Sequence, residues 1–300
     1  RGADLTVCGG ELLKRACVQG KRRMVEYIYK LGYTLSGDDL KQAAMAAAEC
    51  PYVICIKVCH KMGAFGLLTA DELADMAISA MKHRAKCTYK YIMRESKLVF
   101  GTEHLKLAIS RLYANRSAPI LREVSMTQDQ CNELLVYALE TSKYSTASTL
   151  MDLGAVATPA TIAAILCYAS RSSQLFREIV SDYTGTITFQ IWEDALRMLC
   201  EKYRIKSAMV RILGYLPACR AMPTIFMTPG ITKSVIATAL DYYSLRMKEA
   251  LDLVIDNLQD DNVGRLQLII RHYGQMRNIG EYLRRGWPGR IPEHILKKIK

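Results

Sequence analysis

The chain has 300 residues, a net charge of +12, 50% apolar residues and 23% charged residues, which is ordinary for a folded protein. No apolar run reaches the roughly 18 residues that a bilayer-spanning helix requires, so we expect no membrane span. The first ten residues, RGADLTVCGG, lack the basic flank and long apolar stretch of a signal peptide, and they do not begin with Met. We therefore expect a piece cut from a longer protein.

Residues 11–32 predict two short helices, each followed by a glycine. The apolar stripes of the two helices are Leu12, Leu13, Ala16 and Cys17, and then Met24, Val25, Ile28 and Leu31. Gly20 and Gly32 permit the left-handed backbone that ends a helix. Two helices of about ten residues cannot bury their apolar faces alone, so such pairs must stack on one another.

The same pattern recurs along the chain without gaps. Shifts of 31, 122 and 254 residues place Gly32 on Gly63, Gly154 and Gly286, and they place Gly20 on Ser142 and Gly274. Small residues that would let adjacent pairs approach closely stand at Ala16, Ala47, Ala77 and Ala138. We expect these left-handed positions and small residues to mark successive helix pairs.

Further first-helix patterns fill the rest of the chain at intervals of about 28–39 residues. They cover residues 71–81, 103–112, 161–170, 193–202 and 234–243. A repeat of this length is typical of an all-α solenoid. We expect one array over residues 1–300, with both ends cut from a longer repeat protein. Proline-containing stretches near 114–120 and 223–232 are expected to be irregular insertions.

The segment ACVQGKRRMVEYIYKLGYTLS, residues 16–36, resembles the core of an ankyrin repeat, and LMDLGAVATP at 150–159 is similar. The Thr-Pro-Leu-His start of the ankyrin helix is missing, which favours short or degenerate finger hairpins. The resemblance implies an ankyrin-like helix-turn-helix solenoid that binds partners through its concave face, with first-helix outer faces and finger loops. On this chain those contact residues are Arg15, Gln19, Tyr33 and Thr34.

Ten cysteines are present, and several lie in apolar helical patterns, which favours a reducing compartment, the cytoplasm or the nucleus. The tightest cluster is CPYVICIKVCH, with Cys50, Cys55, Cys59 and His60. A zinc site is one interpretation. However, there is no CxxC pair, and Cys55 and Cys59 are one helical turn apart among apolar residues, which favours core packing.

Basic residues gather in three clusters. Residues 14–30 and 82–97 each contain six basic residues and one acidic residue, and residues 264–300 contain nine and two. Such clusters favour the binding of an acidic partner. The alternative is that they are ordinary solvent-exposed faces of helices. The candidate binding residues are Lys21, Arg22 and Arg23; Lys82, Arg84, Lys86 and Lys90, interleaved with Tyr89 and Tyr91; and Arg284 and Arg285 beside Trp287. Trp287 is either a packing residue or an interface anchor.

No enzyme motif is present: there is no Walker loop, HExxH or GxSxG, and the five histidines are scattered. We therefore expect no catalysis, no metal and no cofactor. We interpret the chain as a protein–protein interaction scaffold or adaptor whose partner has an acidic surface. A nucleic-acid-associated helical-repeat protein, binding RNA or DNA as part of a ribonucleoprotein, is the alternative. An enzyme whose catalytic domain lies outside these residues is a third.

Overall fold

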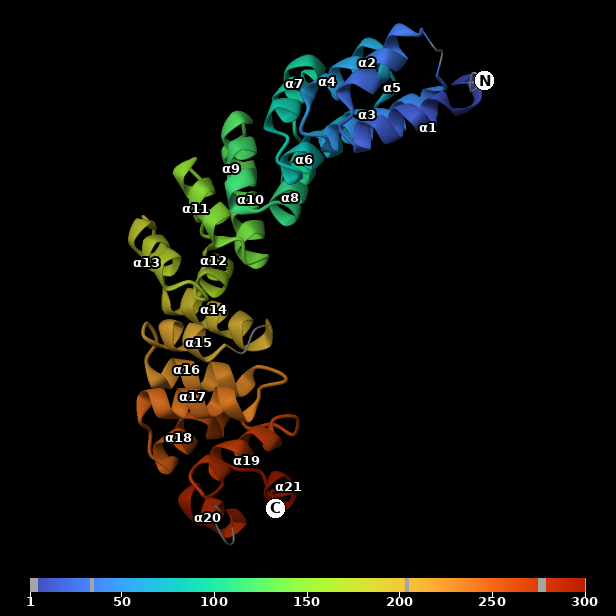
Figure 1. The fold of residues 1–300 in the computed structure, drawn as a ribbon. Coiled ribbons are helices and arrows are strands. Elements are labelled where there is room, and N and C mark those ends of the chain that lie inside the picture. Colours follow the sequence, from blue (N-terminus) through green and yellow to red (C-terminus); the bar gives the residue numbers. More distant parts are fainter. Residues whose placement is uncertain (1–4, 33–34, 203–204, 275–278, 300) are drawn as a thin grey trace. The chain divides into compact units, whose positions relative to one another are not determined.

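The structure is a computed structural model that describes residues 5–32, 35–202, 205–274 and 279–299. Every regular element in those ranges is a helix and none is a strand (Figure 1). The prediction of an all-α protein is therefore confirmed. No helix in the described ranges has both the length and the apolar character that crossing a membrane requires.

The chain divides into two compact units, residues 1–155 and 156–300, where the sequence predicted one array. The helices of the first unit are α1 (Leu5–Val18), α2 (Arg22–Lys30), α3 (Gly37–Glu49), α4 (Val53–Lys61), α5 (Ala64–Leu67), α6 (Ala70–Lys82), α7 (Lys86–Ser96), α8 (Thr102–Arg111), α9 (Ala114–Glu123), α10 (Gln128–Glu140) and α11 (Tyr144–Asp152). Each unit is described by itself below.

The first unit consists of five helix pairs arranged in two layers. The first-helix layer contains α1, α3, α6, α8 and α10, and each of these helices packs against the next. The second-helix layer contains α2, α4, α7, α9 and α11, and each of these helices packs on its own first helix. The four alanines predicted to allow close approach, Ala16, Ala47, Ala77 and Ala138, are all buried.

Three of the first helices, α1, α6 and α10, end in the same left-handed turn. Gly20, Arg84 and Ser142 have φ angles of 64°, 63° and 62°. In each case the next residue donates its backbone N–H to a carbonyl in the last turn, as Lys21 does to Ala16 at 2.9 Å. The predicted equivalence of Gly20 and Ser142 is confirmed. At this left-handed position the Cβ atoms of Arg84 and Ser142 cause backbone strain, which Gly20 does not have because it lacks a Cβ.

Left-handed residues also follow the second helices. Gly32, Gly63 and Gly154 have φ angles of 70°, 93° and 94°, as their alignment predicted. Gly286 was predicted to match them and does not, because it is the last residue of helix α20 (Ile279–Gly286) and has no positive φ.

The two stretches expected to be irregular insertions are mainly helical, so that prediction is wrong. Residues 114–120 begin α9, and residues 223–227 complete α16 (Ala218–Met227), followed by a turn with Gly230 at φ 69°. Pro119 and Pro223 each occupy the sixth position of their helix, where proline removes one backbone hydrogen bond. The burial of apolar side chains in the same helices offsets that loss. These side chains are Ile120, Leu121, Ile225 and Phe226.

The second unit also pairs neighbouring helices. Its elements are α12 (Ile162–Ala169), α13 (Ser173–Asp182), α14 (Phe189–Lys202), α15 (Lys206–Leu213), α16, α17 (Lys233–Tyr243), α18 (Met247–Val254), the 3₁₀ turn Ile255–Asn257, α19 (Val263–His272), α20 and α21 (Glu293–Lys298). The helices α12, α14, α16 and α18 form one row, and α15, α17 and α19 form another. Since α17 packs on α16, residues 234–243 belong to the second helix of a pair and not to a first helix as predicted.

Candidate functional site

The turns between first and second helices lie along one edge of the first unit. We call this the turn edge and define it as residues 19–21, 50–52, 82–85, 111–113 and 141–143. Thr88 of α7 donates its hydroxyl to the carbonyl of Cys50 at 3.2 Å, and Lys143 donates to the carbonyl of Leu112 at 3.5 Å. Arg116 of α9 donates to the carbonyl of Lys82. Side chains of one pair thus satisfy the free carbonyls at the helix ends of an earlier pair, where the helix dipole is negative.

Charge is divided between the two layers of the first unit. Basic residues exceed acidic residues by two in each of α2, α4 and α7 and by one in α9. Acidic residues exceed basic residues by two in α3 and α6 and by three in α10. The second-helix layer is therefore basic apart from α11, whose net charge is −1. In the first-helix layer α3, α6 and α10 are acidic, whereas α1 and α8 have a net charge of +1 and hold cations in ion pairs. Lys106 of α8 illustrates the second case, because Glu103 and Glu133 lie 2.8 and 2.6 Å away and raise the pKa of its ammonium.

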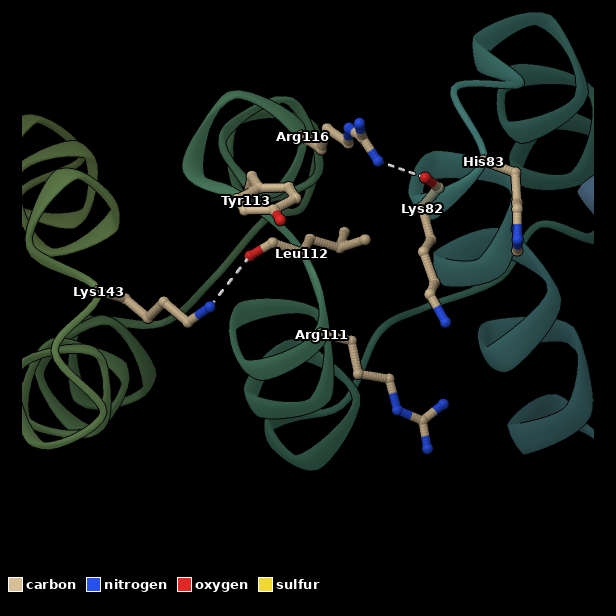
Figure 2. Close-up of a pocket in the computed structure, with 7 residues that line it drawn as sticks. All are labelled: Lys82, His83, Arg111, Leu112, Tyr113, Arg116 and Lys143. Atoms are coloured by element: carbon tan, nitrogen blue, oxygen red, sulfur yellow. Dashed lines mark hydrogen bonds between the residues drawn. The ribbon is translucent and has the colours of Figure 1, made fainter.

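A pocket opens on the turn edge, with a volume of about 450 Å³. We call it the basic pocket. It is lined by Lys82, His83, Arg111, Leu112, Tyr113, Arg116 and Lys143 (Figure 2). These residues come from three consecutive helix pairs, so the pocket depends on the stacking of the pairs and not on one helix alone.

The basic pocket has four cations in its wall and no carboxylate. The nearest acidic partner is Asp75, whose Oδ1 lies 3.6 Å from Nη1 of Arg111, beyond hydrogen-bond distance. Lys82 is exposed, and no described carboxylate pairs with its ammonium. Figure 2 shows the side chains of Lys82, His83 and Arg111 extending in the same direction from the ends of α6 and α8. Several cations that line one pocket without a carboxylate in its wall attract an anion.

Exposed tyrosines stand among the cations of the second-helix layer and the turn edge. Tyr113 is 72% exposed, with the guanidinium of Arg116 5.6 Å from its ring centroid. Tyr27 and Tyr52 are 56% and 50% exposed. Tyr91 lies between two cations, Lys57 and Arg94, at 5.6 and 5.7 Å from its ring centroid. Tyr89, by contrast, is buried, so the two tyrosines of α7 do not share a face.

Most of the predicted contact residues of the first unit are exposed at or beside the turn edge. Gln19, Lys21, Lys82 and Arg84 lie on the edge itself; Arg22 and Arg23 begin α2; and Lys86 and Lys90 belong to α7. Arg15 lies apart from them in α1, in an ion pair of 2.8 Å with Glu11. The predicted contacts Tyr33 and Thr34 lie outside the described residues.

The predicted site near the end of the chain has a different character. Trp287 is 3% exposed, and its Nε1 donates to Oδ1 of Asp252 at 2.5 Å. It is therefore a packing residue, and the interpretation as an exposed interface anchor is wrong. Arg284 pairs with Glu293 at 2.6 Å, and Arg285 pairs with Glu281. These arginines are exposed, but their charges are balanced within the unit.

Three of the four cations of the pocket were not predicted: Arg111, Arg116 and Lys143. They are separated by up to 61 positions from Lys82, so no single cluster of the sequence contains them. One signal was present, because Lys82 and Arg111 are each the last residue of a first helix. Basic residues repeated at that position would have indicated a basic edge.

The cysteine cluster is a core feature, as the packing interpretation predicted. Cys17, Cys50, Cys55 and Cys59 are buried, with the sulfur atoms of Cys50 and Cys55 3.7 Å apart. Burial raises the pKa of Cys50 to about 11, which keeps it a neutral thiol. Among the described residues, no group of three or more His, Cys, Asp or Glu residues could hold a metal ion.

The histidines of the described residues do not gather at one site either. His60 stacks on Phe65 with ring centroids 4.4 Å apart, and its Nδ1 lies 2.8 Å from the hydroxyl of Tyr91. His104 and His272 each face one aspartate of a neighbouring helix, at 3.0 and 3.4 Å. These pairs link adjacent helices.

Comparison with protein-family models, with curated proteins and with solved structures gives no match for this chain.

Proposed function

We propose that this chain is an ankyrin-like helical-repeat solenoid that acts as a protein–protein interaction module. Its first unit binds a partner with an acidic surface. The observation that carries the proposal is the division of charge in the first unit, where a basic second-helix layer backs a largely acidic first-helix layer. Such a division gives the unit one face that attracts acidic partners and another that repels them.

The cations of the second-helix layer are available to a partner. Lys57, Lys61, Lys86 and Lys90 have no carboxylate partner among the described residues. Lys57 instead lies over Tyr91. Exposed tyrosine and arginine side chains are the residue types that most often anchor protein interfaces, because they bury a large area at low entropic cost.

The proposal moves the contact surface away from the concave first-helix face that the ankyrin resemblance implied. The first-helix residue Arg15 is engaged with Glu11. The available cations lie instead on the second helices and at the turn edge. Of the cations expected to bind, those that remain in the proposed surface are Lys21, Arg22, Arg23, Lys82, Arg84, Lys86 and Lys90.

Nucleic acid is the second candidate, and the exposed tyrosines favour it. An exposed aromatic ring beside a cation, as Tyr113 is beside Arg116, can stack on a base while the cations neutralise phosphates. The acidic first helices that adjoin the turn edge argue for the protein partner, since a nucleic-acid backbone needs positive charge along its whole path.

Photo-crosslinking in cells tests the proposal. A benzophenone amino acid replaces Lys90 in the second-helix layer, and a matched variant carries it at Asp129 in the exposed first turn of α10. We expect discrete adducts from position 90 that protease removes and nuclease does not, and few adducts from position 129. Adducts from position 90 that nuclease removes would support the nucleic-acid candidate. Equal labelling from both positions would contradict the proposed surface.

A further inference from the structure

We propose that the basic pocket binds a phosphoryl group carried by the partner protein, so that phosphorylation of the partner controls the interaction. This inference rests on the proposed function and specifies the chemistry of its partner. The pocket residues Arg111, Arg116 and Lys143 are outside the basic clusters on which the sequence interpretation was based, so the pocket is an independent observation.

Several N–H groups that can donate hydrogen bonds lie in one place. Lys82 has an unpaired ammonium, and the Arg111 guanidinium is 3.6 Å from its nearest carboxylate. Arg116 uses Nη1 for the carbonyl of Lys82, and Lys143 makes one long bond of 3.5 Å to the carbonyl of Leu112. Both side chains keep further N–H groups. A phosphate monoester offers three acceptor oxygens and nearly two negative charges at neutral pH, which matches such a set of donors.

Two of the donors are already directed to the turn edge. Arg116 is held by its bond to the carbonyl of Lys82, and Lys143 is oriented by its longer contact with the carbonyl of Leu112, so an anion would have less to order. Leu112, which is buried, and the ring of Tyr113 supply apolar walls between these cations. Prepositioned donors reduce the entropic cost of binding.

The charge around the pocket favours a phosphorylated protein segment over a nucleic acid. The positive charge of the pocket continues onto the second helices, but it does not continue along the first helices α6 and α10. The helices α6 and α10 that lead to the pocket each carry a net negative charge. One phosphoryl group on a peptide fits this arrangement, whereas a chain of phosphodiesters would meet carboxylates on either side.

The test uses the full chain and two peptide libraries with randomised flanking positions, one with a fixed phosphoserine and one with serine in its place. We expect the phosphoserine library to be retained at least about tenfold more strongly. Inorganic phosphate should compete with the phosphoserine library at millimolar concentrations and leave retention of the serine library unchanged. Equal retention of the two libraries would overturn the inference.

Two matched double variants assign the effect to the pocket. Lys82→Gln with Arg111→Gln removes two exposed cations of the pocket and retains the two that bind backbone carbonyls. This variant should reduce retention of the phosphoserine library to that of the serine library. Lys61→Gln with Lys90→Gln removes two cations of the second-helix layer, and it should weaken both libraries by the same factor. A phosphoserine preference that survives the loss of Lys82 and Arg111 would overturn the inference.

The design separates this inference from the proposed function. If the serine library and poly-L-glutamate both fail to bind, the proposed acidic-partner surface fails, and the phosphoserine arm still tests the pocket. If a single-stranded RNA oligomer displaces the phosphoserine library and binds more tightly than it, the pocket belongs to a nucleic-acid site, and the inference is wrong. Circular dichroism of each variant confirms that lost binding is not lost folding.

Discussion

The two halves of the chain carry the same net charge and use it differently. Residues 1–150 contain 21 basic and 15 acidic residues, and residues 151–300 contain 20 and 14, so each half has a net charge of +6. In the second unit four cations near the chain end are paired with carboxylates. Arg290 lies 2.7 Å from Asp256 and Lys298 lies 3.0 Å from Asp260, and Arg284 and Arg285 pair with Glu293 and Glu281. In the basic pocket of the first unit, Arg116 and Lys143 contact backbone carbonyls, and Arg111 has only a longer contact of 3.6 Å with Asp75. Lys82 has no carboxylate partner among the described residues. Local pairing, and not net charge, distinguishes a binding surface from a structural one.

The largest expected effect tests the structural role of the chain end. Trp287→Ala should destabilise the second unit by about 3–5 kcal/mol, because it empties a buried aromatic site and removes the bond to Asp252. Both tryptophans of the chain lie in the second unit, so Trp192 fluorescence during denaturation reports that unit. Trp287→Phe serves as the control and should cost less, since it keeps most of the buried area. An unchanged unfolding midpoint for Trp287→Ala would show that the chain end does not support the second unit.

The next test compares two left-handed glycines of the first unit. Gly20→Ala should cost about 1–3 kcal/mol, because the new methyl group would lie 3.1 Å from the ring of Tyr52 in addition to the strain at φ 64°. Gly32→Ala should cost only about 1 kcal/mol, because its φ is 70° but no atom of the described residues, apart from its chain neighbours, lies within 4 Å of the new methyl group. Thermal unfolding followed by circular dichroism measures both. The same loss for both variants would argue against close contact along the turn edge.

Binding measurements then compare the cations of the two units directly. Lys61→Gln with Lys90→Gln should weaken binding of poly-L-glutamate by about fivefold, as the loss of two exposed ionic contacts implies. Arg284→Gln with Arg285→Gln should leave that affinity within about twofold, because Glu293 and Glu281 already neutralise these arginines. Fluorescence anisotropy at low salt gives both affinities. The comparison between the units breaks down if the Arg284 and Arg285 variant shows the larger loss.

The smallest expected effect concerns pH. The hydrogen bond from Lys298 holds the pKa of the Asp260 carboxyl below its ordinary value. Such a group stabilises the fold above its unfolded pKa of about 4, and that contribution is lost as the pH falls through the lowered value. Asp260→Asn should therefore lower the melting temperature of the second unit by a degree or so near pH 6 and have no effect near pH 2. Asp261→Asn, in the next residue, should have no effect at either pH. A loss that persists near pH 2 would exclude the ion pair as its cause.

Local rules predicted the helix ends well. Gly20, Gly32, Gly63 and Gly154 were found from their spacing alone, because a left-handed helix end selects glycine whatever packs around it. Arg84 has the same φ and was not foreseen, because arginine is an uncommon residue at that position. The surrounding fold imposes its conformation, through the bond from Ala85 to Ala80 at 2.8 Å.

Features that depend on tertiary packing were harder to predict. Pro119 and Pro223 indicated loops, but both lie within helices whose buried faces outweigh one lost hydrogen bond. Trp287 stands between glycine and proline and still becomes buried against Asp252. The basic pocket joins residues from three helix pairs. Its position follows from how the pairs stack, and the periodicity of the chain does not encode that stacking residue by residue.

Hydrogen–deuterium exchange of the full chain, with and without poly-L-glutamate, tests the central claim most directly. If the first unit provides the acidic-partner surface, exchange should slow in α4, in α7 and along the turn edge at residues 82–85, 111–113 and 141–143. Residues 279–299 should be unaffected, and about 0.5 M salt should abolish the difference. Protection that appears at residues 279–299 and is missing from the first unit would contradict the account.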